Sequence, residues 1–146
     1  MRMVHKIALD PNNKQETYFR KAAGTARFAY NWALAEWEKQ YAEGGQPSEI
    51  SLRRYLNYIK EEFYPWMAEV SKNVIQQAIK NLGAAYQNFF SRLAERKRTG
   101  NKRIKLGYPK FKKKGRCTDS FRADGGPATK GADAVRVDGR YTLRGQ

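Results

Sequence analysis

The sequence predicts an α+β fold in which a block of about four helices is inserted between a first strand and several later strands. Three observations lead to this prediction. Residues 3–9 alternate in the manner of a strand. Apolar residues then recur at helical spacing as far as Leu93. Short strand patterns return at 119–123, 134–138 and 140–144, the last two joined in hairpin fashion.

The helical block begins with a capping signal. Asn13, with Glu16 three residues later, predicts a capping box at the start of the first helix. A glycine then interrupts the apolar pattern just before Thr25, which is a good N-cap residue. We therefore expect two consecutive helices, at about 14–23 and 25–42, rather than one.

Two further helices are marked by serine caps. Ser48 or Ser51 is expected to cap a third helix, which Pro65 ends. Ser71 then begins a long helix that reaches Leu93 on its apolar side. These four helices supply most of the apolar side chains for a core.

The pattern divides the chain into three parts: residues 1–10 as the first strand, residues 11–102 as a helical lobe with a helix-turn-helix-like start, and residues 103–146 as a basic loop with the remaining strands.

The start of the chain has no apolar stretch of signal-peptide length, and no apolar run is long enough to cross a membrane. We therefore expect a cytoplasmic protein with no membrane partner. Cys117 is a single cysteine, which excludes an internal disulfide and leaves too few ligands for a zinc site, so we expect no cofactor.

Charge is the strongest global property of the sequence. The net charge is +15 and the pI is about 10.1. Residues 96–122 carry 12 basic residues and 1 acidic residue, so most of the excess lies in one stretch. Such a stretch attracts polyanions, because neutralising phosphates releases their condensed counterions. A solvated linker is the usual alternative for a charge run, but it does not explain why Tyr108, Phe111 and Phe121 are interleaved with the charges.

Cations of this stretch are the candidate phosphate contacts, which give affinity and positioning rather than sequence reading. They are Lys105, Lys110, Lys112, Lys113, Lys114, Arg116 and Arg122. Tyr108 is a further candidate: with Phe111 it either stacks on bases or anchors the loop, and we favour anchoring because aromatics supply much of a small core. A targeting signal remains an alternative for the lysine run. Phe121 is expected to point inward from a strand that carries Arg122 outward.

The long helix offers a possible base reader. Lys72 and Gln76 are four residues apart and therefore share one face, away from the apolar stripe. Glutamine pairs with adenine through two hydrogen bonds, and lysine reaches guanine or phosphate. Spacing alone favours the alternative that both are ordinary exposed helix residues. Asn31 is either a structural amide or a nucleic-acid contact, and we favour structure.

Five segments, in order, resemble the N-terminal part of the TnpB (OrfB) proteins of bacterial insertion sequences, relatives of the type V CRISPR nucleases. The segments are KIALDPNNKQ, GTARFAYNWAL, VSKNVIQQAIKNLGAAYQNFF, GYPKFKKKGRCTDSFR and VRVDGR. The resemblance implies an incomplete wedge-type β-barrel interrupted by a helical recognition lobe. It also implies binding of guide RNA and of double-stranded DNA beside a short transposon-adjacent motif. The helix corresponding to that of Lys72 and Gln76 lies near this DNA in the family.

The resemblance further implies that the nuclease parts, a RuvC-like domain with three metal-binding acidic residues and a zinc ribbon, come after the region that this chain covers. The acidic residues present fall mostly on helix exteriors beside Lys and Arg, where solvated faces are more usual than metal ligands. We expect no catalytic or metal-binding residue, and a truncated TnpB-like, transposase-associated protein that binds RNA or DNA without cutting it. The alternatives are the N-terminal half of a split RNA-guided endonuclease completed by a second chain, or a short DNA-binding regulator.

Overall fold

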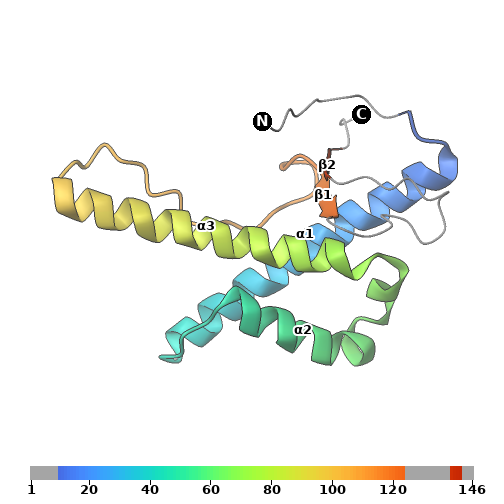
Figure 1. Cartoon of the computed structure of the whole chain (residues 1–146), viewed down its shortest axis with the longest axis horizontal. Helices are drawn as coiled ribbons and strands as arrows, with labels where there is room; N and C mark the ends of the chain where they lie inside the picture. Colours follow the sequence, from blue (N-terminus) through green and yellow to red (C-terminus); the bar gives the residue numbers. More distant parts are fainter. Residues whose placement is uncertain (1–9, 124–138, 143–146) are drawn as a thin grey trace, which may run out of the picture.

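The computed structural model describes residues 10–123 and 139–142 (Figure 1). Its elements are α1 (Asn13–Ala42), α2 (Glu49–Phe63), the short 3-10 helix η1 (Pro65–Glu69), α3 (Lys72–Thr99), β1 (Ser120–Ala123) and β2 (Gly139–Thr142). The long helices α1 and α3 cross each other, and α2 lies along the lower side of the pair in Figure 1. No helix of these described residues is long and apolar enough to cross a membrane.

Helix α1 is a single continuous helix, so the predicted break is wrong. Thr25 is only 4% exposed and lies in the core instead of capping a second helix. A glycine inside a helix costs only about 1 kcal/mol relative to alanine. Buried alanines on both sides of Gly24 pack this stretch of α1 into the core, which outweighs that cost. The capping box is formed by Asn12 and Gln15, one residue before the predicted pair.

The other helix boundaries follow the predicted signals. Ser48 is the N-cap of α2 and exchanges hydrogen bonds with Ser51, so both predicted serines take part in the cap. The helix ends before Pro65, which begins η1. Ser71 caps α3, as predicted. These signals are local, because each cap bonds to a backbone group two or three residues away.

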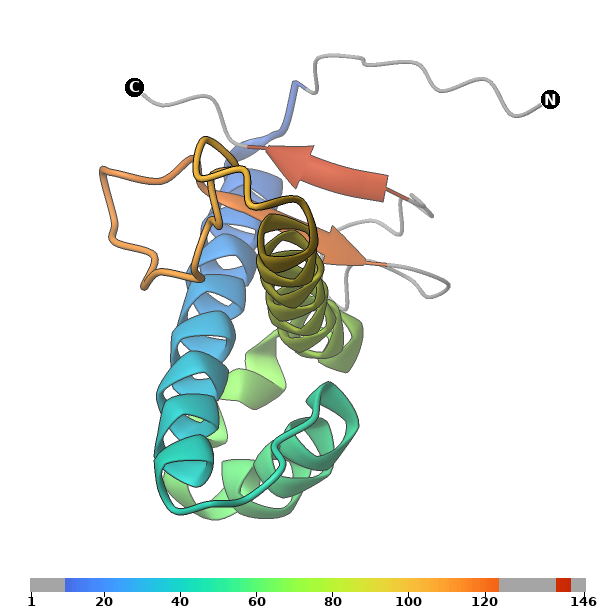
Figure 2. The same ribbon diagram turned by 90° about the vertical axis from the view of Figure 1, so that its left-hand side faces the viewer.

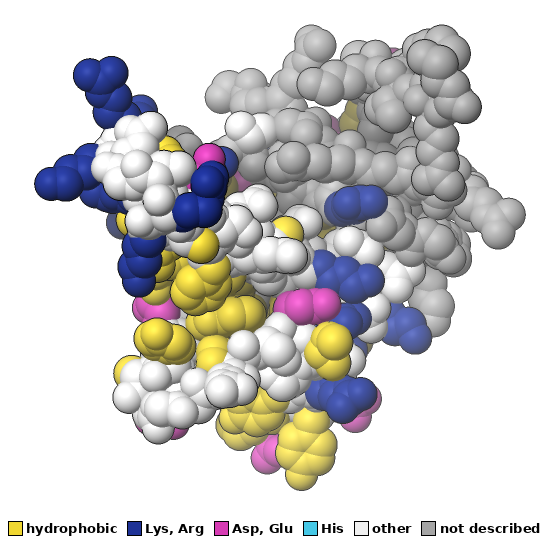
Figure 3. Space-filling model, turned by 60° about the vertical axis from the view of Figure 1, so that its left-hand side comes forward, with side chains coloured by type: hydrophobic (Ala, Val, Ile, Leu, Met, Phe, Trp, Pro, Cys, Tyr) yellow, Lys and Arg dark blue, Asp and Glu magenta, His cyan; other side chains and the backbone are white. Residues whose placement is uncertain are grey.

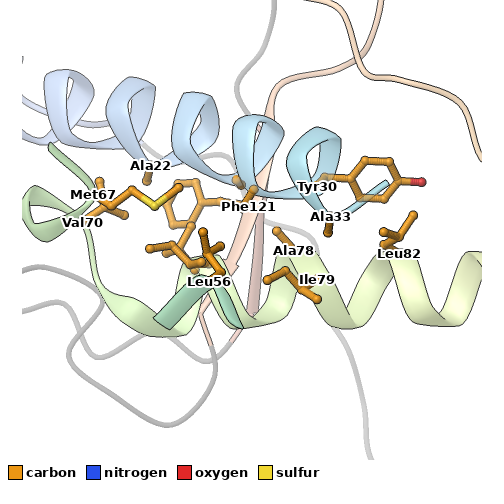
Figure 4. Packing of buried hydrophobic residues seen from close by; sticks show 14 of the residues in the cluster. Ala22, Tyr30, Ala33, Leu56, Met67, Val70, Ala78, Ile79, Leu82 and Phe121 are labelled. Atoms are coloured by element: carbon orange, nitrogen blue, oxygen red, sulfur yellow. The ribbon is translucent and has the colours of Figure 1, made fainter. Parts of the chain in front are cut away.

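Helices α1 and α3 run in roughly the same direction. At one end the backbone N–H of Ser71 donates to the Tyr18 hydroxyl over 3.3 Å, and at the other the ring of Trp37 stacks on that of Tyr86. Small side chains such as Ala33 let the two helices approach closely, and Figure 4 shows this side of α1 facing α3. Leucines of α2, together with side chains of the η1 segment, complete the core. The largest fully buried side chains are Leu34, Leu52, Leu56, Met67, Ile79, Leu82 and Val74.

The strands form one antiparallel pair, in which Phe121 of β1 lies opposite Tyr141 of β2. Phe121 is 2% exposed and packs on Phe19 with ring centroids 5.7 Å apart, whereas Arg122 is exposed, as predicted. The strand predicted at 119–123 is therefore confirmed.

The predicted α+β architecture, a helical lobe inserted into an incomplete barrel, is wrong for the residues that the structure describes. These residues are mostly helical, with one short strand pair and no barrel. The helices bury their apolar faces on one another, and Phe121 of β1 joins the same core. The strands predicted at 3–9 and 134–138 lie outside the described residues.

Candidate nucleic-acid interface

The segment between α3 and β1, residues 100–119, is called the basic loop below. It turns back from the end of α3 and runs beside α1 (Figure 2). Two polar side chains of α1 fix it there. The Asn31 side chain donates from Nδ2 to the Lys112 carbonyl over 2.8 Å, and the Lys112 N–H donates to Asn31 Oδ1 over 2.7 Å. The Arg27 guanidinium pairs with the Asp119 carboxylate at 2.5 Å, with both side chains largely shielded from solvent.

An aromatic contact fixes the loop to α3 as well. The ring of Tyr108 packs nearly at right angles to those of Tyr86 and Phe89, at centroid distances of 5.9 and 5.1 Å. Its hydroxyl lies 3.4 Å from the Tyr86 hydroxyl and donates to Glu38 Oε1 over 3.4 Å. Tyr108 therefore anchors the loop, which was the favoured alternative, although its side chain remains 47% exposed. Phe111 is 49% exposed.

The tyrosines beneath the loop are held in their neutral form. Burial raises the pKa of Tyr86 well above its ordinary value, and the hydrogen bond with Tyr108 raises it further. Burial also raises the pKa of Tyr30. Burial raises the pKa of both tyrosines because a buried phenolate loses its hydration. These hydroxyls act in packing and hydrogen bonding, not as charges.

The predicted phosphate contacts do not all face the same way. Lys112 is half-buried, and its Nζ lies 4.3 Å from the centroid of the Tyr30 ring, so this cation faces α1. The remaining cations of the prediction are exposed on the loop and on β1. They are Lys105, Lys110, Lys113, Lys114, Arg116 and Arg122.

The last turn of α3 extends this charged surface with Arg96, Lys97 and Arg98, placed where the helix dipole favours cations. Figure 3 shows Lys and Arg side chains projecting from one end of the molecule. Two glycines shape the loop. Gly107 has φ +66°, and an added Cβ would lie 2.9 Å from Nη1 of Arg92. Gly115, at φ +81°, lies in a turn where the N–H groups of the two following residues donate to the Lys113 carbonyl.

Lys72 and Gln76 lie elsewhere. Both are in the first turns of α3, where Lys72 is exposed and Gln76 is half-buried. Tyr86, which carries the Tyr108 anchor, is further along the same helix, about 21 Å from Lys72 at the helical rise of about 1.5 Å per residue. Lys72 therefore lies far along α3 from the point where Tyr108 anchors the loop.

Sequence reasoning did not identify the residues of α1 that hold the loop. Arg27, Asn31 and Glu38 are spaced by four and seven residues, so they share one helix face. Asn31 was expected to be structural, and its two hydrogen bonds confirm this. Arg27 and Asn31 interrupt the mostly apolar and aromatic stretch from Ala22 to Leu34, and this was the available signal. Within residues 10–123 and 139–142, no group of three or more His, Cys, Asp or Glu side chains could hold a metal ion.

Comparison with known proteins gives one domain match. Residues 1–46 match a family described as a helix-turn-helix domain, that of OrfB proteins. A helix-turn-helix domain implies DNA binding. The part of this region that the structure describes contains one continuous helix, α1.

Several curated proteins are similar to the chain. It is 30% identical over 119 residues to "Putative RNA-guided DNA endonuclease InsQ" of Escherichia coli K12, which covers 80% of this chain and 26% of that protein. It is 30% identical over 150 residues to "Putative RNA-guided DNA endonuclease Rv2885c" of Mycobacterium tuberculosis H37Rv, covering 93% and 31%. It is also 25% identical over 118 residues to virulence protein VsdF of Salmonella dublin, covering 75% and 91%. The chain thus spans 26–31% of the length of these endonuclease relatives, which is consistent with their catalytic region lying outside it.

Proposed function

Because the chain carries an OrfB-type helix-turn-helix domain and is a distant, partial homologue of TnpB-like RNA-guided DNA endonucleases, we propose that it binds nucleic acid through its basic loop and does not cleave it. The proposed ligands are double-stranded DNA, which the helix-turn-helix domain implies, and RNA. The proposed phosphate contacts are the exposed cations of the loop and of β1.

One observation carries this proposal: the loop backbone is fixed while most of its cations are exposed. The polar bonds of Asn31 and Arg27 hold the loop on its inner side, and the ring of Tyr108 holds it on α3. The exposed side chains of Lys110, Lys113 and neighbouring cations extend from this fixed frame. A ligand that binds there orders side chains but not the backbone, which lowers the entropic cost of association.

Lys112 takes a different role in this proposal from the one that the sequence suggested, because it contributes through its place over Tyr30 instead of through a phosphate. Tyr108 anchors the loop, which is the role that the sequence favoured. A DNA contact by Lys72 and Gln76 is a separate proposal, supported by the exposure of Lys72 at the other end of α3.

A second candidate is the N-terminal part of an RNA-guided endonuclease completed by another chain. The small share of the endonuclease relatives that is covered favours it. VsdF favours the binding module alone, because in that relative the matching region makes up 91% of the protein. Nucleic-acid cleavage by the chain mixed with a separately produced nuclease part, and by neither alone, would support the second candidate.

The test of the binding proposal compares two variants of equal net charge. Fluorescence anisotropy with a labelled DNA duplex, and separately with an RNA hairpin, is measured between about 50 and 300 mM salt. The loop variant carries Lys113→Ala, Lys114→Ala and Arg116→Ala. The control carries Lys14→Ala, Arg54→Ala and Lys60→Ala, which remove three cations from α1 and α2.

The loop variant should bind more weakly, with a logarithmic salt slope shallower by about two to three units, because each lost phosphate contact removes about 0.9. The control should keep the wild-type slope, because its lost cations lie outside the proposed interface. Equal weakening in both variants would show attraction by overall charge, and the loop would then not be the binding site.

A further inference from the structure

Asn31 holds the basic loop by its backbone. Its carboxamide has the same donor and acceptor as a peptide group, and it uses both on one residue, Lys112. The two hydrogen bonds, at 2.8 and 2.7 Å, link positions 81 residues apart and are partly buried. Because they engage the N–H and the C=O of the same residue, they fix both the position and the orientation of that part of the chain.

The contacts on either side give the loop one direction. Arg27, one helical turn before Asn31, holds Asp119, which follows Lys112 in the chain. Further along the same face of α1, Glu38 accepts a hydrogen bond from Tyr108, which precedes Lys112 in the chain. The loop therefore runs antiparallel to α1 along a single polar stripe, and Asn31 lies between the other two contacts.

The cations nearest to this fixed point are exposed. Lys110 lies two residues before Lys112, and Lys113 and Lys114 follow it directly, all three with solvent-exposed side chains. Fixing the backbone at Lys112 therefore sets the positions from which these side chains extend. A loop without this restraint must lose its conformational freedom on binding, and each ordered backbone residue costs about 1–2 kcal/mol.

We infer that Asn31 is a positioning residue for ligand binding: it orders the basic loop before a polyanion arrives, and so raises affinity without touching the ligand. This role rests on the proposed function of the loop as a nucleic-acid interface. It differs from that of the lysines, which act through charge. The two roles can therefore be separated by their salt dependence.

The first measurement concerns the protein without nucleic acid. Hydrogen exchange of the Lys112 amide, followed by NMR, should be slow in the wild type because its N–H donates to Asn31. Asn31→Leu removes both hydrogen bonds at similar side-chain volume and should raise the exchange rate at least tenfold. Asn31→Asp keeps the acceptor and loses the donor, so an intermediate rate is expected. Asn57→Leu, at an exposed asparagine of α2, is the matched control and should leave this amide unchanged.

The second measurement is affinity for a labelled DNA duplex as a function of salt concentration. Asn31→Leu should weaken binding by about tenfold at every salt concentration and leave the logarithmic slope unchanged, because no phosphate contact is lost. Lys113→Ala with Lys114→Ala should instead make the slope shallower. A thermal melt establishes that each variant is folded. If the leucine variant is not, Asn31→Ala replaces it in the exchange and binding measurements, because it also removes both hydrogen bonds without adding a charge.

The outcomes separate the two proposals. If the Asn31 variant binds like the wild type while the lysine variant is weakened, Asn31 does not position the loop for binding. An unchanged exchange rate at Lys112 in the Asn31 variant would overturn the ordering role directly. If both variants bind like the wild type, the proposed function of the loop is wrong, and the positioning role is overturned with it.

Discussion

The indole of Trp37 in α1 and the phenol of Tyr86 in α3 are stacked, with their centroids 4.3 Å apart and their planes inclined by 10°. The ring of Tyr108 in the basic loop packs nearly at right angles to the same phenol, so three segments distant in the sequence meet at Tyr86. Phe90, one turn further along α3, lies against the same ring. These four aromatic side chains join the loop to both long helices. Ionisation of the Tyr86 hydroxyl should therefore lower the stability of the whole fold.

Stability should fall at alkaline pH because of Tyr86. Its pKa in the folded protein is raised above the ordinary value of 10.0, chiefly by burial. For a group whose folded pKa is raised, the stabilisation is complete below the unfolded pKa and is lost as the pH rises above it. The melting temperature should therefore be level between about pH 7 and 9 and fall above about pH 10.

Tyr86→Phe is the matched variant for this prediction, because it keeps the ring and removes the titrating hydroxyl. It should be slightly less stable than the wild type at pH 7, since the contact with the Tyr108 hydroxyl is lost, and it should show a smaller decline above pH 10. An equal decline in both proteins would assign the alkaline transition to other groups, such as Tyr30, whose pKa is also raised.

Two glycines in helices should respond to alanine in opposite directions. An alanine Cβ at Gly83 of α3 would lie 2.9 Å from Cβ of Glu49 at the start of α2, too close without a shift of that helix. At Gly24 of α1 an added Cβ would lie at an ordinary 3.9 Å from the guanidinium of Arg27. The same substitution therefore isolates packing from helix propensity.

Gly83→Ala should destabilise the protein by about 1–2 kcal/mol, because overpacking of about 1–3 kcal/mol exceeds the gain in propensity. Gly24→Ala should stabilise it by about 0.5–1 kcal/mol. Urea unfolding followed by circular dichroism measures both. A stabilised Gly83→Ala variant would show that α2 can move away from α3 at little cost.

The helix caps and the predicted break in α1 show which parts of the fold the sequence could predict and which it could not. The caps at Ser48 and Ser71 were predictable, because a cap and the backbone it bonds are neighbours in the sequence. The break at Gly24 was predicted wrongly, since a local rule cannot count the buried alanines that keep α1 continuous. The strand around Phe121 was recognised, but a barrel does not form from the described residues because the helices already bury one another.

The site was predictable only in its charges. The basic run of 96–122 is visible in the sequence, and so is its aromatic content. The partners that fix the loop are not, because Arg27 and Asp119 are separated by 92 positions. Which lysine turns inward was equally hidden: Lys112 and Lys113 are adjacent and chemically identical, and Lys112 is distinguished by its contacts with Tyr30 and Asn31.

The ion pair between Arg27 and Asp119 should contribute measurably to stability. Its side chains are 20% and 33% exposed, whereas those of the ion pair between Lys21 and Glu69 are 54% and 61% exposed. Screening by water weakens the second pair more than the first. The two pairs therefore form an internal comparison of the same charge types in one protein.

Double-mutant cycles with alanine should give a coupling energy of about 1–2 kcal/mol for Arg27 with Asp119 and less than about 0.5 kcal/mol for Lys21 with Glu69. Unfolding by urea at about 50 mM and 500 mM salt measures both, and the first coupling should be the less sensitive to salt. Coupling energies of equal size would mean that the loop end at Asp119 is more open to solvent than the structure describes.

Tyr108 should act on the loop through its ring and not by stacking on a base. Tyr108→Phe keeps the ring contacts with Tyr86 and Phe89 and loses only hydroxyl contacts of 3.4 Å, so both loop order and nucleic-acid affinity should stay close to the wild type. Tyr108→Ala removes the anchor, and amide exchange in the loop should accelerate without any nucleic acid present. If the tyrosine instead stacked on a base, Tyr108→Ala would lower affinity while exchange in the free loop remained slow. Measuring exchange in the free protein and affinity for RNA in the same two variants therefore separates an anchor from a stacking platform.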